Sequence, residues 1–403
     1  MLCSTRSLTV LSLAAFALCL VPTADVRGAD EAPRLKGARP VIDAIDYDSL
    51  QAAVDALPAE GGVVTLPPGT FELTEPLVIS KSDVLLRGSG TSTHLHNANA
   101  EGKPAILIKH PSKANPPAKE RIWRVQLADF RITGNEKSGH GILADRVNEI
   151  YLNGLSITEN GGDGVRLDNC YEDPRIADCL FTYNKQVGVM LIGCHDIVVS
   201  ANQFEENYDA LHCIDGFNLC MTGNNIDDHL NEGVRIEDTY GSVVSGNMIE
   251  ECAAAGIVLD RDCYGTTLSA NVIAHNGAGI DLRDAHGCAV SANTFTLLKT
   301  DAVRIGPNSG RITVTGNNFS NSYLGEGKVK RKTDDLAAAG LVLEGTTDVA
   351  VSGNLFSGLT TKAIELRGEP SRRVLMDGNV FTDVELDQAD SITTGEILLP
   401  EGK

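Results

Sequence analysis

The feature that most constrains the fold is an asparagine that returns about once in every two dozen residues. It follows a short apolar-x-apolar stretch, and an Ile or Phe stands two positions after it. Successive copies lie 22 to 25 residues apart, with one gap of 37, at Asn202, Asn224, Asn247, Asn271, Asn293, Asn317, Asn354 and Asn379. A period in this range, with several short strands per period, predicts a solenoid.

A second strand follows each Asn after a loop and reads Gly or Ala, apolar, variable, apolar. The copies are Gly164–Leu167, Gly188–Leu191, Gly233–Ile236, Gly256–Leu259, Gly279–Leu282, Ala302–Ile305, Gly340–Leu343 and Ala363–Leu366. This alternation places the apolar residues inside and the variable residue outside. The Leu-x-x-Leu-x-Leu pattern of leucine-rich repeats is absent. The sequence therefore predicts an all-β chain, a single-stranded right-handed parallel β-helix whose stacked Asn side chains form a ladder.

Three N-terminal segments carry a resemblance to a known superfamily: Asp48–Asp55, Gly61–Phe71 and Val84–Gly90. Over most of residues 45–390 the chain resembles the pectate-lyase-like superfamily. The resemblance implies one β-helix domain over residues 40–395, with a cap at about 45–60 whose short helix (Leu50 to Leu57) covers the first turn. Members include polysaccharide lyases, glycoside hydrolases, uronate epimerases, fructotransferases and proteins that are not enzymes. We expect insertions at about 97–122 and 322–336.

The first 28 residues have the pattern of a signal peptide. Arg6 supplies a positive charge, and Leu8 to Val21 is an apolar stretch too short to cross a bilayer comfortably. We therefore expect a secreted, periplasmic or cell-surface protein that has no membrane span once the signal is removed.

Two of the ten cysteines, Cys3 and Cys19, belong to this signal. Cys213 and Cys288 fall at inward positions and are expected as buried thiols. Adjacent turns could join Cys170 to Cys194 by a disulfide, because turns lie about 4.8 Å apart.

The formal net charge of −20 argues against nucleic acid as a partner, since phosphate binding needs a basic surface. An anionic polymer would need a local basic patch. An acidic exported chain could hold Ca²⁺, and Asp260 and Asp281 are the candidate ligands.

The outward positions of the second strand, and the loop before it (His229 included), are crowded with ionisable side chains. The strand ahead of each Asn instead presents Val198, Cys220, Val243, Thr267, Ala289 and Thr313. This contrast predicts a substrate groove on the charged face. We expect catalytic residues among Tyr208, Asp209, His212, Glu232 and Arg235, and substrate-binding residues among Arg166, Asp168, Lys185, Glu237 and Arg304.

The favoured reaction is β-elimination or C5 epimerisation of an acidic, uronate-containing polysaccharide. It needs a base near C5 and a cation on the carboxylate, which Tyr208, His212 and Arg235 could supply. Tyr208 and His212 also resemble the Tyr and His of the catalytic strand in alginate epimerases, although the Asp-Pro of that strand is absent.

Two alternatives stay open. Hydrolysis or fructosyl transfer would use paired carboxylates on adjacent turns, such as Asp209 with Glu232 or Glu237 with Asp260. Gly139-His140-Gly141 resembles a motif of polygalacturonase-type hydrolases, but the paired-Asp motifs are missing, so we attribute it to chance. A β-helix that is not an enzyme, and only binds glycan or builds a surface, is mildly favoured by an aromatic content of 5%. The chain is expected to be a monomer or a trimer.

Overall fold

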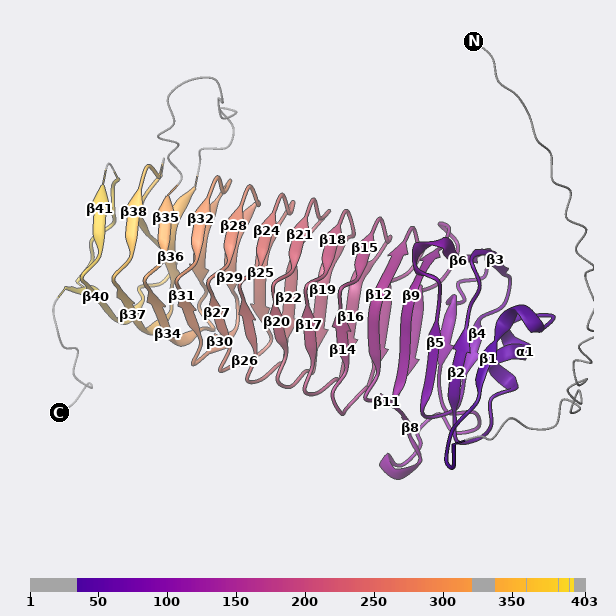
Figure 1. Cartoon of the computed structure of the whole chain (residues 1–403). Coiled ribbons are helices and arrows are strands. Elements are labelled where there is room, and N and C mark those ends of the chain that lie inside the picture. Colours follow the sequence, from indigo (N-terminus) through magenta and orange to yellow (C-terminus); the bar gives the residue numbers. More distant parts are fainter. Residues whose placement is uncertain (1–34, 321–337, 360, 383, 391, 395–403) are drawn as a thin grey trace, which may run out of the picture. The chain divides into compact units, whose positions relative to one another are not determined.

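Each turn of the chain supplies three short strands, and the strands of successive turns pair in parallel. The computed structural model describes residues 35–320, 338–359, 361–382, 384–390 and 392–394, and a compact unit begins at Arg39. A representative turn consists of β20 (Cys220–Thr222), β21 (Asn225–Asp227) and β22 (Val234–Glu237). Figure 1 shows the strands of successive turns side by side. The predicted all-β parallel β-helix is confirmed.

The strand ahead of each Asn builds face 1 of the coil. Its outward side chains carry no charge at the six predicted positions, from Val198 to Thr313, as expected. The strands of face 1 are β1 (Val41–Asp43), β2 (Gly62–Thr65), β5 (Val84–Arg87), β9 (Val125–Thr133), β12 (Tyr151–Thr158), β14 (Arg175–Ala177), β17 (Val198–Ser200), β20, β23 (Val243–Ser245), β27 (Thr267–Ser269), β31 (Ala289–Ser291), β34 (Gly310–Thr315), β37 (Thr347–Ser352), β40 (Arg372–Asp377) and β42 (Ile392–Thr394).

The strand after each Asn builds face 2. The long strands β9 and β12 run through the corner and belong to both faces. The other strands of face 2 are β3 (Gly69–Leu73), β6 (Thr93–Asn97), β15 (Leu180–Thr182), β18 (Gln203–Glu205), β21, β24 (Met248–Glu250), β28 (Val272–Ala274), β32 (Thr294–Thr296), β35 (Asn318–Ser320), β38 (Leu355–Ser357) and β41 (Val380–Thr382).

The Gly-apolar-x-apolar strands form face 3, a separate sheet of 12 strands among the described residues. Glycine opens these strands because the next turn passes very close: a Cβ on Gly279 would lie 2.2 Å from the carbonyl oxygen of Ala302. The strands are β4 (Leu77–Ile79), β7 (Ile106–Ile108), β10 (Ile142–Asp145), β13 (Val165–Asp168), β16 (Val187–Ile192), β19 (Asp209–Ile214), β22, β25 (Ala255–Asp260), β29 (Ala278–Leu282), β33 (Asp301–Ile305), β36 (Ala339–Glu344) and β39 (Ile364–Arg367).

Short strands and helical turns complete the coil. Between face 3 and the next strand of face 1, β8 (Ile122–Trp123) pairs with β11 (Val147–Asn148), and β26 (Cys263–Tyr264) pairs with β30 (Ala285–His286). Three 3₁₀ turns are η1 (Ala44–Asp46), η2 (Gly90–Ser92) and η3 (Ala118–Glu120).

The predicted capping helix is α1 (Leu50–Asp55), which ends two residues before the expected Leu57. The Ser49 hydroxyl accepts a hydrogen bond from the amide of Ala52 and so caps its N-terminus. Leu50 and Val54 are buried on the side that faces the core.

The asparagine ladder at the corner between faces 1 and 2 is confirmed. The Nδ2 of Asn224 donates to the Oδ1 of Asn247 at 2.9 Å, and the Nδ2 of Asn247 donates to the Oδ1 of Asn271 at 3.0 Å. The same contact links each neighbouring pair from Asn202 to Asn379. These side chains are scaffold, because each satisfies buried polar groups of its own and the adjacent turn.

The expected insertion at 97–122 is wrong in its extent. It contains β7, which lies between β4 and β10 in face 3 and is therefore part of the coil. The expected signal peptide (1–28) and the expected insertion at 322–336 lie outside the described residues. No helix in the described part of the chain is long and apolar enough to span a membrane.

The Cys170–Cys194 disulfide is not formed. Both cysteines are buried free thiols, and so are Cys213 and Cys288, as expected. The Sγ of Cys194 lies 3.4 Å from the carbonyl oxygen of Leu167, and the Sγ of Cys170 lies 3.7 Å from that of Ala144. Each thiol therefore meets a carbonyl of the neighbouring turn.

Candidate active site on face 3

Face 3 stacks its outward side chains in columns, one residue per turn. The central column pairs Arg166 with Met190, Met190 with His212 and His212 with Arg235, and it continues through Val258, Asp281 and Arg304. Neighbouring members are about 4.8 Å apart along the backbone. The predicted register therefore holds, and residues two dozen positions apart in sequence meet in space.

One hollow of about 570 Å³ opens over β13, β16, β19 and β22. Five of the ten predicted catalytic and substrate-binding residues line it: Arg166, Tyr208, Asp209, His212 and Arg235. His140, Asp163, Gln186 and Asn231 also line it, and none of these four was among the predicted site residues.

His212 lines the hollow with a half-buried imidazole. Its side chain is 16% exposed, and its Nε2 lies 3.6 Å from the Oε2 of Glu237, too far for a hydrogen bond. Burial lowers the pKa of His212 below its usual value, although the charge of Glu237 opposes this shift. The imidazole is therefore neutral near pH 7 and able to accept a proton.

Asp209 is held in place by two donors from the next turn. One of its carboxylate oxygens, Oδ1, accepts hydrogen bonds from the backbone amide of Glu232 and the Nδ2 of Asn231, each at 2.8 Å. Burial raises the pKa of Asp209 despite these donors. Tyr208, which precedes it, is 47% exposed and therefore open to a ligand.

His140 enters the hollow from the turn before β13. Its Nδ1 accepts a hydrogen bond from the amide of Asp163 at 3.0 Å, so a neutral His140 carries its proton on Nε2. The Oδ1 of Asp163 accepts from the amide of Val187 at 3.1 Å. The Gly139-His140-Gly141 motif was the one sequence signal that could have identified this residue.

Arg235 is clamped by two buried carboxylates. Its Nε donates to the Oε1 of Glu237 at 2.6 Å, and its Nη1 lies 3.1 Å from the Oε2 of Glu232. Burial would raise the pKa of Glu237, but Arg235 and its other cationic neighbours outweigh burial, and the pKa is lowered. Glu232 also pairs with Arg283 at 2.9 Å. Both glutamates therefore hold arginine side chains in fixed orientations.

The other predicted substrate-binding residues lie outside the wall of the hollow, and each has a charged partner. Asp168 pairs with Arg166 at 3.1 Å, and Lys185 lies 3.5 Å from Glu136. Arg304 pairs with Glu344 at 2.5 Å, three turns beyond Arg235.

His229 does not point outward, which corrects our expectation. It is 1% exposed, and its Nδ1 lies 3.2 Å from the carbonyl oxygen of Asn207. It occupies a corner position between faces 2 and 3, where a second ladder joins Asn160 to Asn184 and Asn184 to Asn207.

Asp260 and Asp281 are poorly placed for Ca²⁺. Arg283 donates to the Oδ2 of Asp281 at 2.7 Å, and it lies 3.9 Å from the Oδ2 of Asp260. A Ca²⁺ ion bound to these carboxylates would be repelled by the positive charge of the nearby Arg283 guanidinium.

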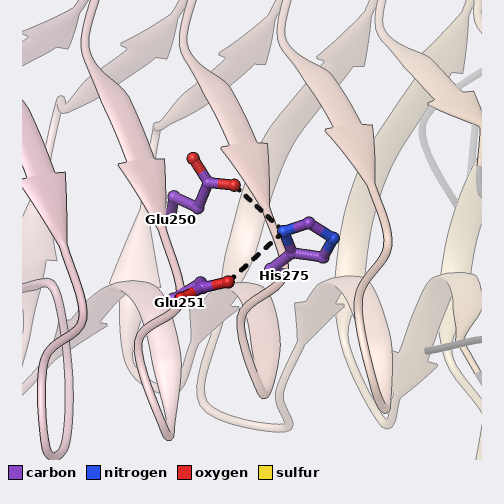
Figure 2. A group of neighbouring side chains, drawn as sticks. All are labelled: Glu250, Glu251 and His275. Atoms are coloured by element: carbon purple, nitrogen blue, oxygen red, sulfur yellow. Dashed lines mark hydrogen bonds and ion pairs between the residues drawn. The ribbon is translucent and has the colours of Figure 1, made fainter. Parts of the chain in front are cut away.

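Three other clusters in the described part of the chain bring metal-ligating atoms within 4.8 Å of one another. In one of them, which Figure 2 shows, the Nδ1 of His275 lies 3.0 Å from the Oε1 of Glu250 and 3.8 Å from the Oε1 of Glu251. The other two are Asp227, Asp228 and Glu251, and Asp262, Asp284 and His286. All three lie at turns outside the hollow.

Comparisons with known proteins agree with this architecture. Residues 140–295 and 255–395 match the family described as right handed beta helix region. No curated protein is matched by the sequence.

Solved structures of similar fold include bacterial carbohydrate enzymes and a bacteriophage tailspike protein. The A-module of the mannuronan C-5 epimerase AlgE6 of Azotobacter vinelandii is 16% identical with a TM-score of 0.65, over 85% of this chain and 99% of that chain. The DFA-IIIase of Arthrobacter chlorophenolicus is 15% identical with a TM-score of 0.58, over 86% and 99%. The α-1,3-glucanase of Streptomyces thermodiastaticus is 16% identical with a TM-score of 0.52, over 90% and 71%. At these identities the likeness concerns the fold.

Proposed function

The chain belongs to the right-handed β-helix family, and from that premise we propose that face 3 binds a polysaccharide and that its hollow is an active site. The observation that carries the proposal is the state of His212, an imidazole kept neutral by burial in the same hollow as the Tyr208 phenol and Arg235. The names of the similar structures, a mannuronan C-5 epimerase, a DFA-IIIase and an α-1,3-glucanase, support a carbohydrate substrate.

The proposed reaction begins with removal of the proton at C5 of a uronate residue. His212 takes this proton, and the C–H electron pair moves into the carboxylate to form an enolate. In elimination, the pair forms the C4–C5 double bond while the bond from C4 to the bridging oxygen breaks, and Tyr208 donates its proton to that oxygen. In epimerisation, Tyr208 returns a proton to the opposite face of C5. The protein would therefore be a lyase or C5-epimerase of an acidic polysaccharide.

Arg166 and Arg235 are the proposed partners of the substrate carboxylate, because both line the hollow. Each already has carboxylate neighbours: Asp168 for Arg166, and Glu232 and Glu237 for Arg235. The enolate carries more charge on its oxygens than the ground-state carboxylate does, so shared guanidiniums stabilise the transition state more than the bound substrate.

A second candidate function is hydrolysis of a neutral glycan, which the buried Asp209 favours. Its raised pKa suits a general acid. Asp163 lies two turns away in the same hollow, so the two main chains are separated by roughly 10 Å, close to the spacing at which a second carboxylate activates water in inverting enzymes. Glu232 and Glu237 suit this role less because both bind Arg235.

We also propose that the protein acts outside the cytoplasm, on the basis of its signal-like residues 1–28. Secretion can be checked by locating the mature N-terminus of protein recovered from the medium or periplasm. Whether the chain is a monomer or a trimer stays a prediction, which sedimentation analysis would decide.

A screen of uronate and neutral polysaccharides with product analysis tests the proposal. Elimination yields an unsaturated sugar that absorbs ultraviolet light, epimerisation changes the C5 configuration, and hydrolysis yields reducing ends without new absorbance. We expect His212→Asn and Tyr208→Phe to lower kcat by at least a hundredfold, the usual range for a lost acid or base. His275→Gln, outside the hollow, is the matched control.

The pH dependence separates the two chemistries. A His212 base must be neutral, so elimination persists as the pH falls below 6.5 and stops only below the lowered pKa. An Asp209 acid must be protonated, so hydrolysis slows as the pH rises above its raised pKa. Hydrolysis products with full activity in His212→Asn would reject the first function. Arg235→Lys is preferable to Arg235→Ala, because the alanine would remove the cation that Glu232 and Glu237 share and would leave each with one arginine, Arg283 and Arg261 respectively.

A further inference from the structure

An uninterrupted row of ring-bearing side chains runs along the coil at the turn that follows face 3. We call Tyr171, His195, Phe217, Tyr240, Tyr264 and His286 the aromatic row; they occur one per turn on six successive turns. Phe217, Tyr240 and Tyr264 are 43%, 40% and 43% exposed, and Tyr171 is 38% exposed. Exposed rings scattered singly need no explanation, but a contiguous exposed row marks an interaction site.

The backbone holds the row at a fixed spacing. The amide of Tyr240 donates to the carbonyl of Gly216, and the carbonyl of Tyr240 accepts from the amide of Asn218. Tyr264 is tied in the same way, to Thr239 and Gly241. Parallel bridges align His195, Phe217, Tyr240 and Tyr264. The backbone positions that carry the rings are therefore held about 4.8 Å apart before any ligand arrives.

Cations and ring contacts frame the row. The Tyr171 and His195 ring centroids are 4.1 Å apart, and those of His195 and Phe217 are 5.6 Å apart. The Arg121 guanidinium lies 4.9 Å from the ring of Tyr171, and that of Arg311 lies 5.7 Å from the ring of Tyr264. The stretch from Phe217 to Tyr264, which carries three of the four most exposed rings, is the open centre of the row.

The surroundings of this open centre are acidic. Asp262, Asp238 and Asp215 together raise the pKa of Tyr240, with Asp262 the largest cause. All three are exposed. Such a surface repels a polyanion, but its carboxylates accept hydrogen bonds from hydroxyl groups.

We propose that the aromatic row is a second carbohydrate-binding surface, separate from the hollow, that takes an extended chain of neutral sugars. The apolar faces of sugar rings pack on aromatic rings. One pyranose unit of an extended chain is about as long as the distance between adjacent turns of the coil. Exposed carboxylates beside the rings bind the sugar hydroxyls. A protein partner fits less well, since a stable interface covers about 800 Å² per side and the row is one residue wide.

The row does not depend on the chemistry proposed for the hollow. It lies three to five residues beyond the last outward position of each face-3 strand that precedes it, and none of its members lines the hollow. Binding to the row would keep the protein on a mixed polysaccharide while the hollow works on an uncharged or acidic segment of it.

The test measures binding of the full-length protein to soluble neutral polysaccharides (a β-glucan, a xylan, an α-glucan) and to a polyuronate, by calorimetry and affinity electrophoresis. We expect at least one neutral polymer to bind. Phe217→Ala and Tyr240→Ala should each weaken that binding roughly two- to tenfold, and the double variant should weaken it more than either single variant. Tyr183→Ala is the matched control, since Tyr183 is also exposed and has the acidic neighbours Glu206 and Glu205 but stands outside the row.

The readouts separate the row from the hollow. Row variants should keep the wild-type kcat on oligosaccharides too short to reach the row, whereas His212→Asn should lose turnover and keep polymer binding. The proposal is overturned if no neutral polymer binds, if binding is unchanged in the double variant, or if the polyuronate alone binds. It is also overturned if sedimentation shows a dimer that the double variant abolishes, because the row would then be a contact between two copies.

Discussion

His229 shows how a ladder position can change the chemistry of a side chain. In the three preceding turns the same corner holds an Asn, up to Asn207. The Nδ1 of this enclosed imidazole lies 3.2 Å from the Asn207 carbonyl oxygen, and its Nε2 is buried without a hydrogen bond. Burial lowers the pKa of His229 to about 4.

The fold should therefore lose stability in mild acid through His229. Between pH 6.5 and 4 the unfolded chain binds a proton at this residue and the folded chain does not, so the free energy of unfolding falls as the pH falls. The loss from pH 7 to pH 4.5 is about 2 kcal/mol for this group.

Urea unfolding of the wild type and His229→Asn at both pH values measures this loss. We expect the variant to lose less stability on acidification than the wild type by about that amount. His195→Asn, at a half-exposed histidine, is the control. Equal acid sensitivity in the wild type and His229→Asn would contradict the buried, neutral state.

At the scale of elements, the Asn ladder is what holds successive turns in register. The Oδ1 of Asn247 accepts hydrogen bonds from both the backbone amide and the Nδ2 of Asn224, at 3.0 and 2.9 Å. Its own Nδ2 donates to the Met221 carbonyl and to the Oδ1 of Asn271. One side chain therefore satisfies four groups on the two adjacent turns.

Asn247→Ala should lower the free energy of unfolding by roughly 2–4 kcal/mol, because it leaves two buried donors of Asn224 without acceptors. Asn379→Ala, at the half-exposed last rung of the ladder, should cost less because water can replace the lost contacts. Chemical unfolding of both variants measures the difference. An equal loss of unfolding free energy in both variants would contradict the account, because burial would then not determine what a lost ladder contact costs.

At the scale of the whole molecule, most of what the sequence could predict follows from the positions of the repeated Asn residues. Because a coil of fixed period repeats its register, these positions indicate which side chains of the face-3 strands point into the coil and which point outward. The prediction fails at His229, because strict alternation ends where the strand ends and the residue lies in a corner. It also fails at Ile106–Ile108, a three-residue strand too short to stand out between polar loops.

The site could be predicted only in part, since its assembly depends on contacts between turns. His212 and Arg235 follow from the register, but the clamp of Glu232 and Glu237 on Arg235 requires knowledge of side-chain direction. The aromatic row has the same period as the ladder, from Tyr171 to Tyr264, and a search for periodic aromatics would have found it.

Loss of the C5 proton tests the central claim most directly. The wild-type protein is incubated with a polyuronate in D₂O, and the C5 proton is followed by NMR. We predict that the C5 signal disappears, through exchange or elimination, and that His212→Asn slows this loss at least a hundredfold while His275→Gln leaves it unchanged. A persistent C5 proton during cleavage of the polymer, or loss at the wild-type rate in His212→Asn, would contradict a His212 base.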